Sequence, residues 1–379
     1  MSDQPTYLDC NATTPMEPQV LERVRFFLEE EFGNEGSRTH SFGARSKQAV
    51  QKARDQVAEV VAAKREEVVF TSGATESNNL AILGLEEYGR SNSRMHVIAT
   101  AIEHKAVLEP IEELEARGFD VTFLPVNVGG WVEPESIEDA LRPETLLVSV
   151  MQANNETGVR QPLAEISDAL KDHDAFFHVD AAQGFGKDIE VLQDQRIDLI
   201  SVSGHKIYGP KGVGALVTRK RGFRRTPLKP LSFGGGQERG LRPGTLPVAL
   251  IAGLGEAASL ALKHHEKRKS RCEEIRKEAI SALSPLSPKV MGDSDRVMEH
   301  VLCFAFPGVD SEALMVSLKD LIAISNGSAC TSHSYTPSHV LKAMGFDDDQ
   351  VAEAVRISWC HLTPDVDWKA VRERIKTLM

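Results

Sequence analysis

Cysteines are scarce in this sequence, and long apolar runs are absent. Five cysteines occur among 379 residues, and no two of them form a C-x-x-C pair. A disulfide framework or a structural zinc site is therefore not expected, and the composition fits a reducing compartment. No apolar run approaches the roughly 18 residues of a membrane span, and the first residues lack the apolar core of a signal peptide. We therefore predict a cytoplasmic protein without metal ions or membrane contacts.

An excess of positive charge is also missing. The chain has 44 Lys and Arg residues against 55 Asp and Glu residues, which gives a net charge of −11. Such a chain is not expected to hold the phosphates of a nucleic acid over a broad face, although a local basic patch stays open. The strongly basic segment at residues 263–271 is interpreted as a solvated helix face. We therefore predict no direct contact with nucleic acid.

The sequence does contain a regular alternation of short apolar, β-branched runs with amphipathic runs. The predicted strands are residues 68–71, 96–100, 121–124, 146–151, 176–180, 197–202 and 214–218. The predicted helices between them are residues 76–90, 104–117, 134–141 and 163–172. This alternation indicates an α/β fold with a mainly parallel, doubly wound sheet, whose ligands lie beyond the carboxyl ends of the strands.

The last third of the sequence has a different pattern. A long helical run is predicted for residues 247–282, and shorter elements at 301–306, 310–318 and 340–344 indicate a smaller α+β unit. Length alone, at about 150 residues per domain, suggests two domains. We therefore predict a large domain at residues 16–258 and a small domain at residues 259–379, against which residues 1–15 pack.

A lysine follows one of the predicted strands, in the segment DLISVSGHKIYGPKGVGAL. Lys206 lies in a turn with small and polar neighbours, where its side chain can enter a pocket. Its amine could form a Schiff base with an aldehyde cofactor. On spacing alone, an ordinary surface lysine is the commoner explanation.

A carboxylate ends another predicted strand, in the segment FHVDAAQ. Asp180 follows apolar residues, and burying a carboxylate is costly unless it is paired. A carboxylate against the pyridinium nitrogen of pyridoxal phosphate keeps the ring of that cofactor an electron sink. Asp180 and Lys206, 26 residues apart at two strand ends, fit such an enzyme. A helix cap is the alternative role for Asp180.

The segment TSGATESNN places small residues between a predicted strand and a predicted helix. Backbone N–H groups at a helix start, together with the hydroxyl of Thr75, can bind an anion such as a phosphate. A plain capped turn is the alternative. The segment is not a Walker loop, because no Gly-Lys-Ser/Thr triplet occurs, and glycines 234–236 lack the strand–helix context of dinucleotide binding.

Two further residues are candidates for chemistry. His104 follows a predicted strand in TAIEHKAV, where it either caps a helix or stacks on a cofactor ring and moves protons. Cys330 lies in SNGSACTS, whose small polar residues indicate an exposed loop with an accessible thiol. An incidental cysteine is the alternative for Cys330, whereas Cys303 lies in an apolar run and is interpreted as buried and inert.

Nine segments, in order along nearly the whole chain, resemble the motifs of the cysteine desulfurases. These segments are YLDCNATTP, FTSGATESNNLAI, TAIEHKAVLEP, QANNETGVRQP, HVDAAQ, SVSGHKIYGPKGVGAL, GGGQERGLRPGTLP, SNGSACTS and VRIS. The resemblance implies the aminotransferase class-V fold, pyridoxal 5′-phosphate as cofactor, L-cysteine as substrate and a homodimer. It also implies conversion of L-cysteine to L-alanine and a persulfide on Cys330, which passes its sulfur to an acceptor protein.

The resemblance implies a role for each matching residue. Three residues are expected to be catalytic, because Cys330 attacks the substrate sulfur, Lys206 holds the cofactor and moves the α-proton, and His104 stacks on the ring and transfers protons. The remaining expected binding residues are Asp180 at the ring nitrogen, Gln183 at the ring hydroxyl, Thr75, Ser203 and His205 at the phosphate, Thr245 at the phosphate of the neighbouring subunit, Asn155 at the cofactor, and Asn155 with Arg356 at the substrate carboxylate.

The sequence departs from the family pattern at three places. Cys10 stands where the family usually has Asn, residues 33–40 read GNEGSRTH, and the chain ends soon after Trp368 without the longer tail by which some members dock iron–sulfur scaffolds. The first two variants resemble the desulfurases of bacterial DNA phosphorothioation, which makes that pathway the expected destination of the sulfur. Iron–sulfur cluster assembly and tRNA thiolation are the alternative destinations. A selenocysteine lyase of the same fold, or a weakly active sulfur-relay subunit that uses Cys330 as a carrier, is the alternative function.

Overall fold

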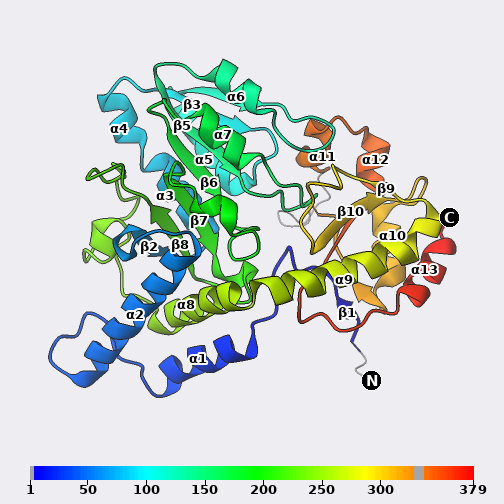
Figure 1. Ribbon diagram of the computed structural model, residues 1–379, viewed down its shortest axis with the longest axis horizontal. Helices are drawn as coiled ribbons and strands as arrows, with labels where there is room; N and C mark the ends of the chain where they lie inside the picture. The colour runs from blue at the N-terminus through cyan, green and yellow to red at the C-terminus, as the bar shows by residue number, and fades with distance from the viewer. Residues whose placement is uncertain (1–3, 328–336) are drawn as a thin grey trace.

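The computed structural model describes residues 4–327 and 337–379, and its main feature is a sheet of seven strands (Figure 1). The strands are β2 (Val68–Thr71), β3 (His96–Thr100), β4 (Asp120–Leu124), β5 (Thr145–Met151), β6 (Phe176–Asp180), β7 (Leu199–Ser203) and β8 (Gly214–Thr218). Their order across the sheet is β2-β8-β7-β6-β5-β3-β4, and the last five strands are parallel. β8 runs antiparallel to both β2 and β7. The predicted α/β fold with a mainly parallel sheet is confirmed.

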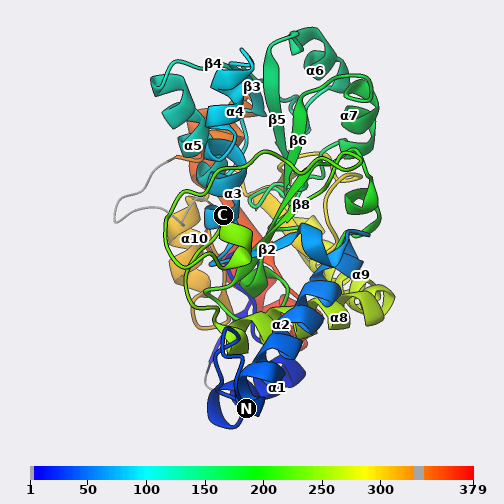
Figure 2. The same cartoon turned by 90° about the vertical axis from the view of Figure 1, so that its left-hand side faces the viewer.

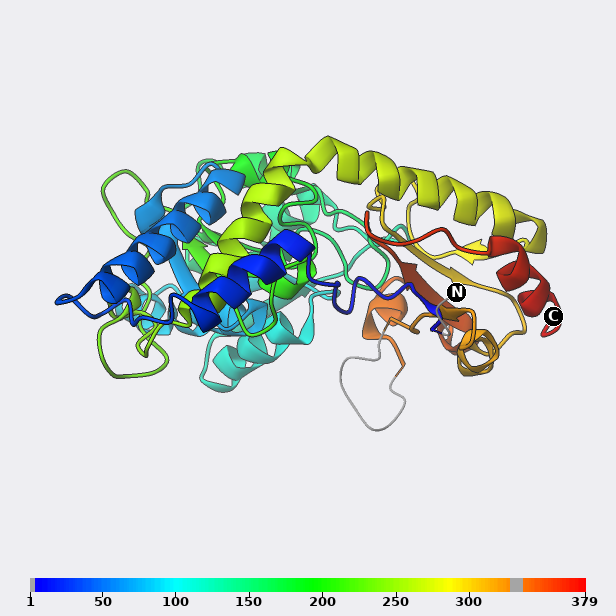
Figure 3. The same cartoon turned by 90° about the horizontal axis from the view of Figure 1, so that it is seen from below.

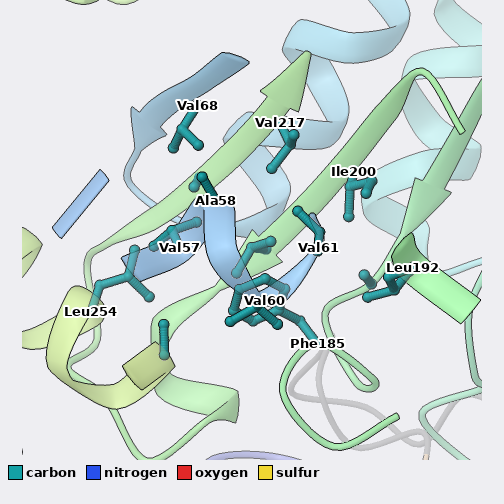
Figure 4. Packing of buried hydrophobic residues seen from close by; sticks show 14 of the residues in the cluster. Val57, Ala58, Val60, Val61, Val68, Phe185, Leu192, Ile200, Val217 and Leu254 are labelled. Atoms are coloured by element: carbon teal, nitrogen blue, oxygen red, sulfur yellow. The ribbon is translucent and has the colours of Figure 1, made fainter. Parts of the chain in front are cut away.

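Helices cover both faces of this sheet (Figure 2). The helices of this part of the chain are α1 (Pro18–Glu29), α2 (Ser41–Val60), α3 (Ala74–Leu83), α4 (Glu86–Ser91), α5 (Lys105–Ala116), α6 (Pro134–Ala140), α7 (Leu163–Ala169) and α8 (Val248–Lys263). One face packs against α2 and α8 through a core that includes Val57, Ile200 and Leu254 (Figure 4). The other face packs against α3 and α5 through Leu80 and Ile111. Because both faces are covered, β5 and β6 are buried along their whole length, which explains their continuous apolar sequences.

The C-terminal part of the chain builds a smaller sheet around its own core. The strands β9 (Lys289–Val290), β10 (Val301–Ala305) and β12 (Ala354–Ser358) pair antiparallel in the order β12-β10-β9. The helices here are α9 (His265–Leu283), α10 (Ser311–Leu318), α11 (His339–Ala343), α12 (Asp348–Glu353) and α13 (Trp368–Lys376).

The N-terminal segment crosses to these C-terminal elements, as the blue trace in Figure 3 shows. β1 (Thr6–Tyr7) pairs in parallel with β11 (Ile322–Ala323). Asp9 then bridges to Ser358 at the end of β12. The N-terminal segment is therefore paired with C-terminal strands. This pairing holds residues 11–13 beside the edge of the large sheet.

Two predicted helices are each divided in the structure. The run predicted at 247–282 breaks between α8 and α9, because His264 has φ −115° and ψ 15°, outside helical geometry (Figure 3). The run predicted at 76–90 breaks after α3, where the carbonyl of Gly84 accepts a 2.8 Å hydrogen bond from the backbone N–H of Lys229. Among the helices of the described ranges, none is both long and apolar enough to cross a membrane.

The basic segment at residues 263–271 is not fully solvated, which corrects its interpretation. Arg268 in α9 is buried, and its guanidinium lies 5.1 Å from the centre of the Tyr208 ring. Its charge is balanced by an ion pair with Glu17. Pairing with a carboxylate and stacking on an aromatic ring make burial of this guanidinium tolerable.

A buried ion pair attaches the glycine-rich segment at residues 234–240 to the large sheet. The carboxylate of Glu238 accepts two hydrogen bonds of 2.6 Å from Arg54 in α2. It also accepts a 2.8 Å hydrogen bond from the backbone N–H of Phe70 in β2. The pair therefore fixes the strand that leads directly into residues 72–75.

Candidate active site

A cavity of about 620 Å³ lies at the carboxyl edge of the parallel strands. Its walls come from the turns after β2, β3, β5, β6 and β7, from residues 11–13 and from β12. The predicted site residues on its walls are Thr75, His104, Asn155, Asp180, Gln183, Ser203, His205, Lys206 and Arg356. The structure therefore brings these residues together at the edge where ligands of such sheets bind, in a cavity of the size usual for small molecules.

Two predicted site residues are not on these walls. Thr245 is exposed, lies shortly before α8, and does not line the cavity of its own chain. Its expected contact concerns a neighbouring subunit, so this role stays a prediction. Cys330 lies outside the described residues.

A second cavity, of about 520 Å³, adjoins the first. The two cavities share His104 and Asn155 as wall residues. Gly327 and Pro337, which lie at the two boundaries of the described ranges, also line the second cavity. The chain on either side of the segment that contains Cys330 is thus placed next to His104.

Lys206 carries its amine into the first cavity. The lysine ends a short 3-10 turn, Gly204–Lys206, which directly follows β7. Its Nζ donates hydrogen bonds to the backbone carbonyls of Asn11 and Ala12, the latter at 2.9 Å. These carbonyls belong to the N-terminal segment, so the position of the amine depends on the contact between the two ends of the chain.

Asp180 is buried at the end of β6 and is held by two donors. The Nδ2 of Asn78 donates to its Oδ2 at 2.8 Å, and the backbone N–H of Ala182 donates to its Oδ1 at 2.9 Å. Asn78 is fully buried in α3 and lines the cavity. The sequence prediction missed Asn78, because nothing in TSGATESNN distinguishes it from its half-buried neighbour Asn79.

A candidate anion site lies where α3 begins. Residues 72–75 stand at its N-terminus, and Ser203 and His205 line the cavity with them. A Cβ atom at Gly214 would lie 2.6 Å from the Cα of Gly73, so glycine allows β8 to approach this turn closely. Free N–H groups at the start of a helix, with hydroxyls beside them, suit a phosphate.

His205 is an uncharged member of this anion site. Burial, and then the cations of Lys206 and Lys211, lower the pKa of His205 to about 4. Its Nδ1 lies 3.2 Å from the hydroxyl of Thr13. At neutral pH the imidazole therefore contributes hydrogen bonds, while Lys206 and Lys211, which also line the cavity, supply positive charge.

His104 is held in one orientation at the start of α5. Its Nδ1 accepts a 3.0 Å hydrogen bond from the backbone N–H of Ala106. Burial is the main cause that lowers the pKa of His104, although Asp180 acts against it. The neutral ring therefore carries its proton on Nε2, because Nδ1 is already an acceptor.

Arg356 presents a buried guanidinium at the opposite wall. Its terminal nitrogens donate to the carbonyl of Asn155 at 2.8 Å, to the Oδ1 of Asp9 at 2.6 Å and to the hydroxyl of Ser325 at 2.9 Å. Its Nε is buried and has no hydrogen-bond partner among the described residues. The side chain is therefore rigid, and its Nε–H has no acceptor in the described ranges.

Gln183 and Asn11 leave acceptor atoms unused beside the cavity. Gln183 donates from Nε2 to the carbonyl of Asn11 at 3.0 Å, and its Oε1 is buried without a partner among the described residues. The Oδ1 of Asn11 is likewise buried and has no partner there. Buried polar atoms are rarely left unsatisfied, so these atoms indicate a polar ligand. Asn11 was missed as a wall residue, although it lies in the motif YLDCNATTP.

Glu103, which precedes His104, was also missed. Its Oε1 accepts from the hydroxyl of Thr100 at 2.6 Å and from the backbone N–H of Met151 at 2.9 Å. Burial is the main cause that raises the pKa of Glu103 to about 8, and Asp180 adds to the shift. The carboxyl is therefore mainly protonated at neutral pH and acts as a neutral spacer between β3 and β5.

The chain is similar to known proteins over nearly its whole length. The family model for aminotransferase class-V matches residues 6–370. The chain is 45% identical to "Cysteine desulfurase, mitochondrial" of Drosophila melanogaster over 97% of this chain and 79% of that protein. It superposes on the structure of a NifS-like protein with a TM-score of 0.91 and 35% identity, covering 99% of this chain and 100% of the other. For DndA from Streptomyces lividans the TM-score is 0.83 and the identity 49%, covering 94% and 99%.

Proposed function

The chain belongs to the aminotransferase class-V family and, within it, to the cysteine desulfurases, and we propose that it converts L-cysteine to L-alanine and a persulfide on Cys330. One observation carries this proposal. A lysine amine, a buried carboxylate and a buried guanidinium, from Lys206, Asp180 and Arg356, line one cavity at the carboxyl edge of the sheet. An amine that can bond a carbonyl carbon, a carboxylate for a cationic ring nitrogen and a fork for a substrate carboxylate are the groups that this reaction needs.

Pyridoxal phosphate is the cofactor that fits these residues. When bound, it supplies an electron sink that weakens the bond between the substrate Cβ and its sulfur. The turn at residues 72–75, with Ser203 and His205, would hold its phosphate, and Asp180 would pair with its ring nitrogen. The unused Oε1 of Gln183 would accept from its ring hydroxyl. Lys206 would bond it covalently.

The substrate carboxylate would be bound by Arg356 with Asn155. Three protein acceptors already fix the guanidinium plane, so little side-chain entropy is lost when the carboxylate binds. The Nε–H, which has no acceptor among the described residues, would supply a donor for that carboxylate. This arrangement favours an α-amino acid whose carboxylate points toward β12.

Proton transfers would be shared between Lys206 and His104. The Lys206 amine is held by two weakly basic carbonyls, so it can leave them to take up the α-proton. His104 has its Nδ1 occupied and its proton on Nε2, which makes that nitrogen a hydrogen-bond donor toward a bound substrate. Stacking of the uncharged ring on the cofactor agrees with the lowered pKa of His104.

Cys330 would be the nucleophile that takes the substrate sulfur. The described residues on both sides of its segment line the second cavity, and that cavity shares His104 and Asn155 with the first. Both described boundaries of this segment therefore lie beside the cavity in which Arg356 would hold the substrate. The persulfide would then pass to an acceptor protein.

The destination that we propose for the sulfur is DNA phosphorothioation. The variants at Cys10 and at residues 33–40 resemble that branch of the family, and the similarity to DndA supports the same assignment. The net charge of −11 suits an enzyme that hands sulfur to a protein and does not itself hold DNA. We further propose that it acts as a cytoplasmic homodimer, with Thr245 contacting the phosphate site of the neighbouring subunit.

The thiol step is tested by Cys330→Ser. We expect this variant to lose sulfide release from L-cysteine in the presence of a reductant, while it keeps the absorption band of the bound cofactor. Cys303→Ala, in β10, is the matched control and should retain sulfide release. Undiminished sulfide release from Cys330→Ser would overturn the persulfide mechanism. Retained selenide release together with lost sulfide release would favour a selenocysteine lyase, and a wild type without turnover would favour a sulfur carrier.

The cofactor anchor is tested by borohydride reduction followed by denaturation. The cofactor should stay on the wild-type chain and should be released from Lys206→Ala. Peptide mapping of the reduced wild type should place the added mass on the peptide that contains Lys206. A reduced cofactor attached to any other lysine would contradict the proposed anchor.

A further inference from the structure

Two cysteines from opposite ends of the chain meet behind the N-terminal wall of the cavity. Cys10 and Cys360 are each 1% exposed, and they pack with Tyr208 in one buried cluster. The backbone N–H of Cys10 donates to the carbonyl of Ser358 at 3.1 Å, so the two segments are hydrogen-bonded neighbours. Asp9 bridges to Ser358 in parallel, so Cys10 and Cys360 follow this bridge on neighbouring segments and enter the same buried cluster.

The two thiols differ in their chemical state. The hydrogen bond from the Cys10 thiol, aided by the hydroxyl of Thr363 at 3.7 Å, lowers the pKa of Cys360 to about 6. The same hydrogen bond and burial raise the pKa of Cys10 above its usual range. Of the two sulfurs, Cys360 therefore loses its proton more readily, and Cys10 is the thiol that donates to it. One reactive sulfur next to one protonated sulfur is the arrangement of a nucleophilic and a resolving cysteine.

A buried lysine amine interacts with the pair. Lys187 interacts electrostatically with Cys10, Cys272 and Cys360, and burial lowers the pKa of its amine to about 8. Its Nζ lies 3.2 Å from the Nε2 of His300. With a pKa of about 8 this amine is mainly protonated at neutral pH, and a cation near the pair favours the thiolate form of its sulfurs.

A cavity adjoins the buried pair. A cavity of about 390 Å³ is lined by Cys10 and Cys360 together with Thr13, Thr14 and Thr363. The walls combine threonine hydroxyls with apolar residues such as Pro15 and Leu362, and they can accommodate a small hydroperoxide. A metal ion is a weaker candidate, because the described residues contain no group of three His, Cys, Asp or Glu side chains placed to hold one.

We propose that Cys10 and Cys360 form an oxidisable dithiol that a hydroperoxide converts to a disulfide. The Cys360 thiolate attacks one peroxide oxygen, which forms Cys360–SOH and releases hydroxide or alkoxide. The Cys10 thiol then attacks the sulfenic sulfur, the S–S bond forms, and water leaves with the proton of Cys10. The two sulfurs are oxidised by two electrons in total, and the peroxide is reduced by the same two electrons.

The pair is next to the active site but separate from the cysteine of the proposed reaction. Cys10 precedes Asn11, whose carbonyl accepts hydrogen bonds from Lys206 and Gln183. Cys10 stands where the resemblance leads us to expect Asn, so the pair is not part of the usual family pattern. The proposal does not depend on the desulfurase activity.

The test uses the full chain with its cofactor and hydrogen peroxide as the oxidant. Free thiols are alkylated under denaturing conditions, and the protein is digested without a reductant for mass spectrometry. We expect a peptide pair joined through Cys10 and Cys360, lighter by two hydrogens than the sum of its parts and absent after dithiothreitol. Cys303, which lies in a different core, is the internal control and should stay alkylated.

A variant separates the two chemical steps. Cys10→Ser removes the resolving thiol, so dimedone should label Cys360 as a trapped sulfenic acid after peroxide treatment. If this variant does not fold, the linkage measured in the wild type decides alone. The proposal is overturned if Cys10 and Cys360 are alkylated as completely as Cys303 after treatment, or if either of them is joined to Cys330 instead.

Discussion

Glu103 gives a direct test of how burial controls protonation beside the cavity. Its carboxyl is enclosed between β3 and β5, and its pKa is raised from 4.5 to about 8. The folded protein therefore keeps this proton over a pH range in which the unfolded chain has lost it. Because the raised pKa belongs to the folded state, the stability of the protein falls as pH rises from about 4.5, and the fall levels off above about 8.

The informative change is Glu103→Gln, which keeps the shape and an acceptor oxygen for Thr100 and Met151 but does not titrate. At about 1.4 kcal/mol per pKa unit, the free energy of unfolding of the wild type should fall by about 2–3 kcal/mol relative to the variant between pH 6 and pH 9. Urea unfolding of the cofactor-free proteins at the two pH values, followed by circular dichroism, measures this change.

The matched control is Glu59→Gln on the exposed surface of α2. Its difference from the wild type should be the same at both pH values, because water already solvates that carboxylate. If the difference between the wild type and Glu103→Gln were also independent of pH, Glu103 would be ionised in the folded protein. The account of its burial and of its role as a neutral spacer would then be wrong.

Three further changes test a buried ion pair, a buried carboxylate and the guanidinium that would bind the substrate carboxylate. Arg54→Met leaves Glu238 buried without its partner, so the free energy of unfolding in urea should fall by about 3–5 kcal/mol. The additional change Glu238→Leu should restore most of this loss, and equal losses in the single and double variants would refute the reasoning. Asn78→Ala removes one of two donors to the carboxylate at the end of β6 and should cost about 1–3 kcal/mol in the same assay, whereas the exposed control Asn92→Ala should cost less than about 0.5 kcal/mol. Arg356→Lys keeps the charge but loses the planar fork, so steady-state kinetics should show a KM for L-cysteine about 10–100-fold higher with a smaller change in kcat, and an unchanged KM would remove the carboxylate role.

The strands of the large sheet could be predicted closely from the sequence. β2, β3, β6 and β8 have the predicted bounds, because each is a short apolar run that is buried on both faces and ends at polar or small residues. Since parallel strands present their carboxyl ends at one edge, residues predicted after different strands had to meet there. This is why Thr75, His104, Asp180 and Lys206 share one cavity.

Contacts that join distant parts of the chain could not be predicted in this way. Asn78 reaches the carboxylate at the end of β6 across 102 residues, and Asp9 reaches Arg356 across 347 residues. Local pattern carries no information about such pairs. The break of the long helix at His264 was missed for a related reason, because α9 turns away to pack on the C-terminal core and no glycine or proline marks the bend.

The pairing of β1 with β11 has a consequence for how the protein is made. At about 5–20 residues per second, synthesis of 379 residues takes roughly 20–75 s. The strands of the large sheet, residues 68–218, leave the ribosome well before β12 with Arg356. Closing a loop between Asp9 and Ser358 is a late step for entropic reasons, since nearly the whole chain lies between them. A nascent chain can therefore already form the turns of the anion site. Arg356, which would bind the substrate carboxylate, joins the site only after it has been synthesised and Asp9 has paired with Ser358.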